Sequence, residues 1–148
     1  MSDLCPSDDQ LRALLARVRT IAVVGFSANP ARPSHYVSEF LVGRGYRVVP
    51  VNPGLSGKMF FGVEAVAELS DILEPVDMVD VFRRSDHVPD LAEQALGLQM
   101  RPSLFWMQLG VAHAKAAQTL QAKGVDVVQN RCPKMEIPRL FPPGWSRG

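Results

Sequence analysis

The sequence lacks the features of several specialised protein classes. Its 148 residues include only two cysteines, Cys5 and Cys132, which are too few to hold together a small disulfide-rich secreted domain. No apolar run reaches the roughly 20 residues that span a bilayer, and residues 1–10 are too polar and acidic for a secretory signal. We therefore expect a cytoplasmic protein with no membrane partner.

The sequence also lacks an excess of either charge. Sixteen basic side chains are balanced by 15 acidic ones, so the formal net charge is +1 at pH 7. Proteins that bind duplex nucleic acid usually carry a large basic excess, and we expect no such partner here. Because 47% of the residues are hydrophobic, the chain can bury a core, and its length suits one domain.

Short apolar runs alternate with helix-forming segments along most of the chain. Runs such as 20–26 suit strands that are buried on both faces. The alternation predicts an α/β fold: a single doubly wound, Rossmann-like domain with a mainly parallel sheet of five to six strands. Strands are predicted at 20–26, 47–51, 76–82, 103–107 and 125–129, with a short edge strand at 58–61. Helices are predicted at 7–19, 34–41, 63–69 and 111–123, and from Asp86 onward.

These elements divide the chain into three parts. Residues 1–19 are predicted to form a helix that packs on the domain, 20–140 the Rossmann-like domain, and 141–148 a flexible tail. In sheets of this kind, ligands bind at the carboxyl ends of the strands. The loops to examine are therefore 25–34, 52–58, 82–86, 108–110 and 130–134.

The first of these loops is short of glycine. Residues 25–34 follow the first strand and open a helix, which is the position of a phosphate-binding turn. The usual GxGxxG pattern is absent, because only Gly25 is present. The hydroxyls of Ser27 and Ser34 and the guanidinium of Arg32 nevertheless suit phosphate oxygens. We favour anion binding over the alternative, an ordinary strand-to-helix connection with Ser34 as N-cap.

The end of the second predicted strand lacks the carboxylate with which NAD enzymes hold the ribose. Asn52 and Pro53 stand there instead. Lys58 suits a phosphate on or near a ribose, and suits a solvated surface position equally well. NADP or another phosphorylated adenosine compound therefore stays open at this point. The third strand ends in Arg83 and Arg84, of which we expect one to face the site and the other to face solvent.

The residues at these strand ends resemble those of a known family. The run Gly25, Ser27, Pro30, Arg32, Pro33, Ser34 and Val37 resembles the opening motif of the small CoA-binding proteins. These proteins are similar to the CoA-binding domain of the succinyl-CoA synthetase alpha subunit. The resemblance continues in order from about 20 to 140, through 49–53, 57–58, 79–84, 106–110 and 130–132.

The resemblance implies a Rossmann-like CoA site. The pyrophosphate would lie on 25–34, the adenosine against 51–53 with Lys58 near its 3′-phosphate, and the pantetheine arm across 82–83 toward 108–110. The segment 135–138 departs from the Ile-Glu-His pattern of the family. The residues that would bind the cofactor, coenzyme A or an acyl-CoA, are Gly25, Phe26, Ser27, Asn29, Arg32, Pro33, Ser34, Val51, Asn52, Pro53, Lys58, Phe82, Arg83, Gln108 and Gly110.

No catalytic or metal-binding residue is predicted. His35, His87 and His113 fall on helices without metal-ligand spacing, and we expect them to lie at the surface. Asp80, in mid-strand, is expected to bond to loop backbone or to Arg83 or Arg84. The favoured function is therefore a cytoplasmic CoA or acyl-CoA binding protein without catalytic machinery of its own. The alternatives are a small NADP-dependent oxidoreductase and a protein-interaction module, for instance a homodimer that covers the edge strand 58–61.

Cys132 suggests one further possibility. Arg131 and Lys134 flank it, and nearby cations favour the reactive thiolate form. Beside a bound CoA thiol, Cys132 could form a reversible disulfide. The alternative is a small buried residue, since cysteine is among the most buried residue types.

Overall fold

The computed structural model describes residues 5–147, which form a parallel five-stranded sheet in the order β2-β1-β5-β6-β7. The strands are β1 Thr20–Val24, β2 Arg47–Val51, β5 Met78–Val81, β6 Leu104–Met107 and β7 Asp126–Val128. Nearly every strand residue is buried, as expected for a parallel sheet with both faces covered. The predicted Rossmann-like α/β fold is confirmed, with five strands in the main sheet.

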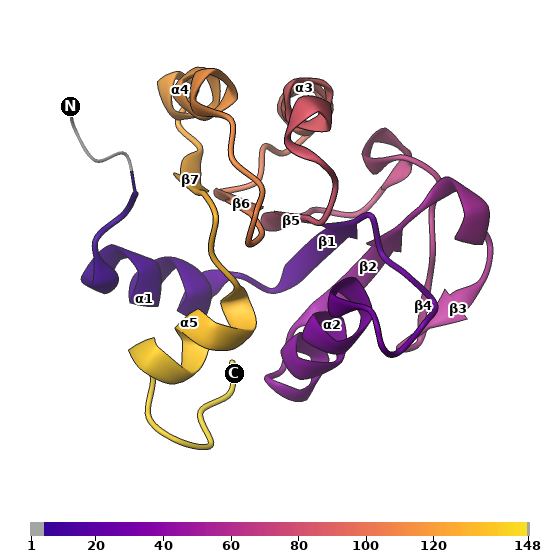
Figure 1. Cartoon of the computed structure of the whole chain (residues 1–148), viewed down its shortest axis with the longest axis horizontal. Helices are drawn as coiled ribbons and strands as arrows, with labels where there is room; N and C mark the ends of the chain where they lie inside the picture. Colours follow the sequence, from indigo (N-terminus) through magenta and orange to yellow (C-terminus); the bar gives the residue numbers. More distant parts are fainter. Residues whose placement is uncertain (1–4, 148) are drawn as a thin grey trace.

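Helices cover both faces of the sheet. Figure 1 shows α3 (Val88–Leu96) and α4 (Ala114–Ala122) on one face, and α1 (Asp8–Arg17), α2 (Pro33–Gly43) and α5 (Pro133–Leu140) on the other. Two apolar clusters fill the layers between the sheet and these helices. No helix among residues 5–147 is long and apolar enough to cross a membrane.

The outer edge of β2 carries a small hairpin. β3 (Met59–Phe60) and β4 (Val63–Glu64) pair antiparallel, and Val66 then makes a single parallel bridge to Val51. Val66 stands where a Rossmann sheet has its third strand, so that strand is reduced to one bridge. The predicted helix at 63–69 is therefore wrong: backbone groups there pair with β2 and β3, and only a 3-10 turn at Leu69–Asp71 follows.

One helix boundary differs from the prediction, and one helix was not predicted. α4 begins at Ala114 rather than Val111, because His113 caps it by accepting the Ala116 N–H at 3.1 Å. α5 was not predicted at all. Pro133 opens it and Pro138 lies inside it. Two prolines only five positions apart argue against a helix when the sequence alone is considered.

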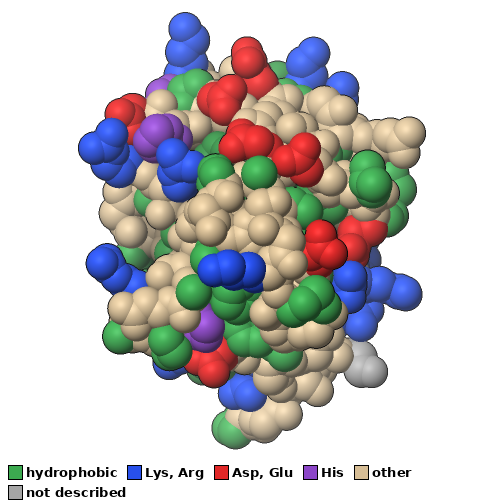
Figure 2. Space-filling view, turned by 90° about the vertical axis from the view of Figure 1, so that its right-hand side faces the viewer, with side chains coloured by type: hydrophobic (Ala, Val, Ile, Leu, Met, Phe, Trp, Pro, Cys, Tyr) green, Lys and Arg blue, Asp and Glu red, His purple; other side chains and the backbone are tan. Residues whose placement is uncertain are grey.

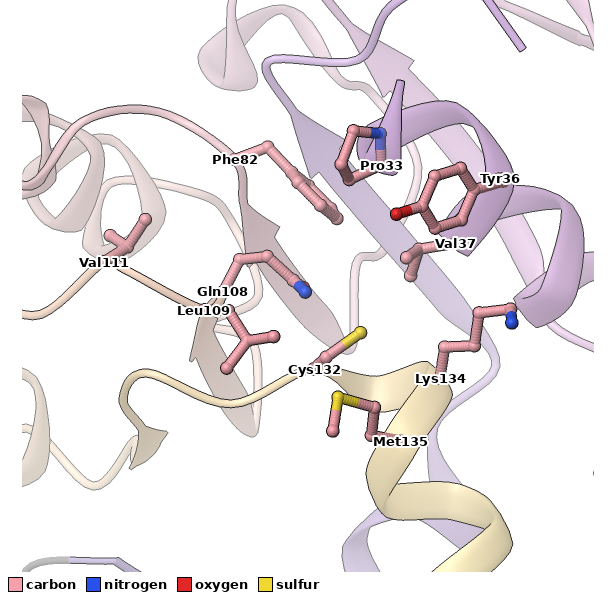
Figure 3. Close-up of a pocket in the computed structure, with 10 residues that line it drawn as sticks. All are labelled: Pro33, Tyr36, Val37, Phe82, Gln108, Leu109, Val111, Cys132, Lys134 and Met135. Carbon is pink, nitrogen blue, oxygen red and sulfur yellow. The ribbon is translucent and has the colours of Figure 1, made fainter. Parts of the chain in front are cut away.

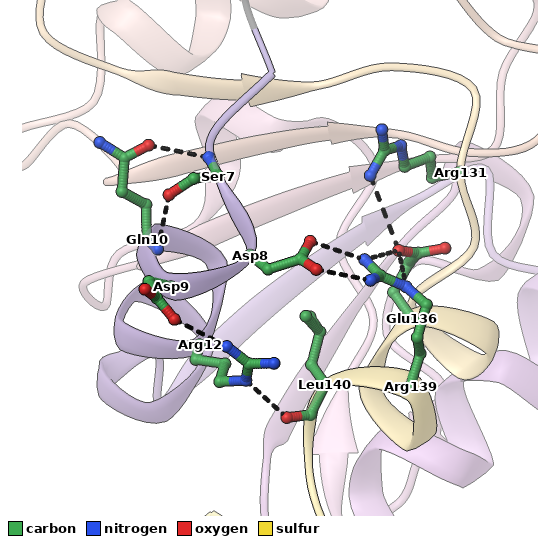
Figure 4. Close-up of polar contacts among 9 residues, drawn as sticks. All are labelled: Ser7, Asp8, Asp9, Gln10, Arg12, Arg131, Glu136, Arg139 and Leu140. Carbon is green, nitrogen blue, oxygen red and sulfur yellow. Dashed lines mark hydrogen bonds and ion pairs between the residues drawn. The ribbon is translucent and has the colours of Figure 1, made fainter.

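The first and last helices dock on each other through polar contacts (Figure 4). The Asp8 carboxylate accepts two hydrogen bonds from Arg139, at 2.8 and 3.0 Å, and Arg139 also bonds to Glu136. Arg12 Nε donates to the Leu140 carbonyl at 2.8 Å. The paired guanidinium of Arg139 lowers the pKa of Asp8 below its usual range. These contacts attach α1 to α5.

The C-terminal segment packs against the domain instead of forming a frayed tail. The rings of Phe141 and Trp145 stack with centroids 3.8 Å apart. Arg147 donates from its side chain to the Val18 carbonyl at 2.7 Å and from its backbone N–H to the Arg44 carbonyl at 2.6 Å. The proline and glycine content of the segment suggested mobility, whereas its aromatic pair and terminal arginine anchor it.

Candidate functional site

Four strand ends meet in one row at the carboxyl edge of the sheet. The last residues of β2, β1, β5 and β6 pair side by side in the register of the sheet. The residues that follow are therefore neighbours, in the order Asn52, Gly25, Phe82 and Gln108. β2 is added to one side of β1, and β5 and the later strands are added to the other side. The point between β1 and β5 at which the strand order switches is where ligands bind in open α/β sheets.

Gly25 allows the first loop to pass close to the neighbouring strand end. Its φ is +86°, in the region that favours glycine, and a Cβ there would lie 3.1 Å from the Phe82 carbonyl oxygen and from Arg83 Cδ. A single glycine therefore allows both the positive φ and the close approach to the neighbouring strand end. The loop beyond it is longer than in GxGxxG proteins.

Short hydrogen bonds organise the loop that follows. Ser27 Oγ accepts the Asn29 N–H at 3.1 Å, and Asn29 Oδ1 accepts the Ala31 N–H at 3.0 Å. Ser34 Oγ accepts the Ser27 N–H at 2.9 Å and so closes the loop. Each hydroxyl still has its proton to donate, so these serines can hold the loop and contact an anion at once.

The start of α2 is open to an anion. The predicted N-cap, Ser34, is wrong: Arg32 is the N-cap residue and Pro33 opens the helix, while the Ser34 hydroxyl is turned to Ser27. No side chain caps this helix end, and the exposed Arg32 lies beside it. An uncapped helix N-terminus attracts negative charge through its N–H groups and dipole.

His35 supports the loop from below rather than lying on the surface as predicted. It is 9% exposed, and its Nδ1 lies 2.8 Å from the Ser27 carbonyl oxygen. Its ring packs against Phe26 and Phe61, at 5.2 and 5.5 Å between centroids. Phe26 is fully buried in this aromatic cluster, so its side chain lies in the core and not in the predicted site.

Two adjoining cavities lie along the row of strand ends. The first, of about 330 Å³, is lined by residues of the loop and helix start: Gly25, Ser27, Arg32, Pro33, Ser34 and Phe82. The second, of about 430 Å³, lies between α2 and α5. Pro33 and Phe82 line both cavities, so the two adjoin there; together we call them the groove, which has a polar end and a largely apolar end.

The apolar end combines residues from four separate segments (Figure 3). Figure 3 shows the side chains of Phe82, Val37 and Cys132 around one central space, with the Gln108 amide directed toward it. Gln108 is only 5% exposed, and its Oε1 has no hydrogen-bond partner among residues 5–147. The ten lining residues are Pro33, Tyr36, Val37, Phe82, Gln108, Leu109, Val111, Cys132, Lys134 and Met135.

Sequence reasoning missed much of this apolar end. Tyr36 and Val37 follow Pro33 at helical spacing, and that spacing could have placed them beside it. Lys134 falls in the predicted edge loop 130–134, whereas Met135 could not have been placed, because α5 itself was not foreseen. The Lys134 ammonium lies 6.0 Å from the centroid of the Tyr36 ring and 5.8 Å from that of Phe40, across the gap between α5 and α2.

A third cavity, of about 210 Å³, lies on the α3 side of the same sheet edge. Val51, Pro53 and Arg83 line it, together with the acidic side chains Glu68 and Asp90. Arg83 Nη2 lies 3.4 Å from the ring nitrogens of His87.

The two arginines after β5 diverge as predicted. Arg83 lines the third cavity, whereas Arg84 is exposed and pairs with Asp86 at 3.6 Å.

Some predicted residues support the site without lining these cavities. Asn52 donates to the Phe26 carbonyl at 2.8 Å and accepts the Gly54 N–H at 2.9 Å, so it ties β2 to the first loop. Gly110, with φ +84°, donates to Asn130 Oδ1 at 2.7 Å. Asn29 shapes the loop, and Lys58 lies exposed at the hairpin, outside all three cavities.

Asp80 has neither of the partners expected for it. It is fully buried in the middle of β5, and both carboxylate oxygens have no hydrogen-bond partner among residues 5–147. Burial raises the pKa of this carboxyl well above its usual value, because the charged form is poorly solvated there. Burial therefore favours the neutral form of the side chain in the folded protein. Within the described part of the chain, no group of three His, Cys, Asp or Glu residues could hold a metal ion.

Comparisons with known proteins agree with this arrangement. A family model described as "CoA binding domain" matches residues 19–138, which include the loop, all four strand ends and most of α5. The chain belongs to this CoA-binding domain family. Its relatives include an uncharacterized protein of Bacillus subtilis, YneT, which is 40% identical over 130 residues, covering 88% of this chain and 93% of YneT.

Solved structures of the same fold extend the comparison. A Thermus thermophilus protein, cell-free ID.343, superposes with a TM-score of 0.81 at 44% identity, over 92% of this chain and 100% of its own. Acetyl-coenzyme A synthetase 1 of Ca. Korarchaeum cryptofilum superposes with a TM-score of 0.61 at 19% identity, over 82% of this chain and 27% of the synthetase chain. At that identity the second likeness shows the fold alone.

Proposed function

We propose that this protein binds CoA or an acyl-CoA along the groove at the carboxyl edge of its sheet. The observation that carries the proposal is that the two cavities share Pro33 and Phe82 and so lie next to each other. One end presents hydroxyls, an arginine and an uncapped helix N-terminus, and the other is largely apolar. CoA has the matching division, with phosphates in its middle and a long, weakly polar pantetheine arm.

The polar end suits the pyrophosphate. Gly25 leaves room for close approach to backbone, Ser27 and Ser34 can donate hydroxyl hydrogens, and Arg32 supplies a positive charge. The third cavity suits the adenosine, because Pro53 and Val51 offer apolar contact and Glu68 and Asp90 can accept hydrogen bonds from an exocyclic amine.

The apolar end suits the pantetheine arm. The arm contains two amide groups, and an amide carbonyl can accept a hydrogen bond from the Gln108 side-chain nitrogen, which Figure 3 shows directed into the cavity. We infer a ligand-binding role and assign no catalytic residue.

Titration calorimetry with CoA and with NADPH tests the proposal. We expect CoA to bind with one site per chain, and Arg32→Ala to weaken binding by about tenfold, the value of one charge-assisted hydrogen bond. Arg84→Ala is the matched control, because Arg84 lies at the same edge but points to solvent. Binding of NADPH without binding of CoA would refute the proposal.

A further inference from the structure

Cys132 lies at the apolar end of the groove and is reached from it. The residue precedes α5 as its N-cap position, is 7% exposed, and belongs to the lining of the larger cavity. Figure 3 shows its sulfur directed into the space that Gln108, Phe82 and Val37 surround. A reagent that enters the groove therefore meets this sulfur, whereas the rest of the residue is packed against the core.

A second observation indicates that a ligand group belongs next to this sulfur. Gln108 lines the same cavity and is only 5% exposed, and Figure 3 shows its amide nitrogen directed into the space. Native proteins rarely leave a buried amide group unsatisfied unless a ligand or water completes its hydrogen bonds. The arrangement thus calls for a hydrogen-bond acceptor within the cavity, close to Cys132.

The groove sets which end of a bound CoA reaches this point. The phosphate-binding features lie in the first cavity, and Pro33 and Phe82 form the border with the second. In CoA the thiol lies at the far end of the pantetheine arm from the pyrophosphate. A CoA whose phosphates lie on the first loop therefore brings its thiol end into the cavity of Cys132.

We propose that Cys132 forms a reversible mixed disulfide with CoA, so that this protein captures oxidised CoA; the proposal rests on the CoA-binding function proposed above. The co-reactant is a CoA disulfide. The Cys132 thiol loses its proton to water, and its sulfur attacks one sulfur of the CoA disulfide. The S–S bond of the reagent breaks as the Cys132–CoA bond forms, and the other half leaves as a CoA thiolate that takes up a proton. A thiol reductant reverses the step.

The electrostatics of the cavity rim are compatible with an anionic reagent. The Lys134 ammonium lies at the cavity, over the faces of Tyr36 and Phe40, and no carboxylate is among the ten lining residues. The flanking Arg131 is engaged by Glu136, at 3.7 Å. Of the two cations that the sequence places beside Cys132, Lys134 is the one among the residues that line the cavity.

Intact-protein mass spectrometry after incubation with CoA disulfide tests the proposal. We expect a mass increase of one CoA less two hydrogens, removed by dithiothreitol, and peptide mapping of the wild-type protein should locate it at Cys132. Cys132→Ser and Cys132→Ala should abolish it, and Cys5→Ser, the matched control, should not. Because the groove holds the reagent in place, the reaction should be at least about tenfold faster than with glutathione disulfide at equal concentration.

Calorimetry of Cys132→Ser with reduced CoA separates the two proposals. If the variant binds CoA and wild-type Cys132 stays unmodified, the disulfide is refuted while the binding function stands. Equal rates with CoA disulfide and glutathione disulfide also refute it, because the groove would then play no part. If neither wild type nor variant binds CoA, both proposals fail together.

Discussion

Gly25 is the residue on which the geometry of the first loop depends most. Two costs are combined there: a positive φ, and a space that a Cβ would fill against the Phe82 carbonyl. Gly57 has nearly the same φ, +87°, but open space where its Cβ would be. The two positions therefore separate backbone strain from close approach.

We predict that Gly25→Ala lowers the free energy of unfolding by about 2–3 kcal/mol and Gly57→Ala by about 1 kcal/mol. Gly25→Ala should also weaken CoA binding by more than tenfold, because the displaced loop moves away from its ligand. Urea unfolding and calorimetry measure the two effects. Equal stability losses in the two variants would show that close approach at Gly25 has no importance.

Asp80 makes stability depend on pH. Its folded-state pKa is raised by burial, so the neutral form stabilises the fold at low pH. Unfolding then releases a proton above the ordinary aspartate pKa of about 4, and stability is lost as pH rises from there toward the folded-state pKa. The loss amounts to at most about 1.4 kcal/mol per pH unit within that range.

Asp80→Asn keeps the shape of the side chain and removes its titration. We expect the free energy of unfolding of the variant, minus that of wild type, to rise with pH above the ordinary aspartate pKa of about 4. Urea unfolding at several pH values measures this difference, in which the effects of other groups cancel. A difference that stays constant with pH would contradict the burial of an uncompensated carboxyl.

At this scale the sequence predicted residue types better than residue partners. Ser27, Arg32, Pro33 and Gln108 do line the groove. His35 is predicted to lie at the surface but is buried. Its burial depends on contact with Phe61, 26 positions away, and no local sequence pattern reveals that contact. Likewise, nothing local indicates that Asp80 lies without a partner.

At the scale of elements, the strands of the main sheet were predicted well, whereas the segment 63–69 and α5 were not. Parallel strands buried on both faces carry a continuous apolar signal, and this signal marked all five strands of the main sheet. The segment 63–69 carries a similar apolar pattern in a shorter run, and its pairing depends on the edge of β2. α5 depends on docking against α1 and α2, which compensates for its poor helical sequence.

The β3–β4 hairpin carries Lys58, the predicted partner of the CoA 3′-phosphate. Lys58 is exposed and lies outside the three cavities, so only a phosphate that projects from the groove can reach it. Phe60 packs on Phe26 with centroids 5.0 Å apart, so the hairpin rests on the loop of the site.

We predict that CoA at 100 times its dissociation constant raises the Tm of wild type by about 5–10 °C. Lys58→Ala should reduce the shift with CoA and leave the shift with 3′-dephospho-CoA unchanged. Thermal unfolding of wild type and Lys58→Ala with each ligand measures the interaction between Lys58 and the 3′-phosphate, as the difference between the two changes in Tm shift. If Lys58→Ala changes both shifts equally, Lys58 does not contact the 3′-phosphate.

At the scale of the whole molecule, a near-neutral net charge coexists with a local anion site. Figure 2 shows acidic and basic side chains interspersed over the face turned to the viewer, rather than one broad basic field. Several cations near the sheet edge have partners, Arg84 with Asp86 and Arg131 with Glu136, whereas Arg32 lines the first cavity beside the helix start. This pattern suits one small anionic ligand in a groove better than a polyanion.

The groove itself could be foreseen only in outline. The sequence located the sheet edge, because the alternation of elements predicts parallel strands and the carboxyl ends of parallel strands lie at one edge. It could not show that the cavity between α2 and α5 adjoins the phosphate loop, because that adjacency arises from packing between segments about 100 residues apart.

Native mass spectrometry with CoA, NADP and ADP in competition tests the central claim most directly. At equal concentrations of the three ligands, we predict a single species with one CoA per chain, and a loss of that species in Arg32→Ala but not in Arg84→Ala. A dominant complex with NADP, or equal occupancy by CoA and ADP, would contradict the account, because the first would assign the groove to a dinucleotide and the second would leave the apolar cavity without a role.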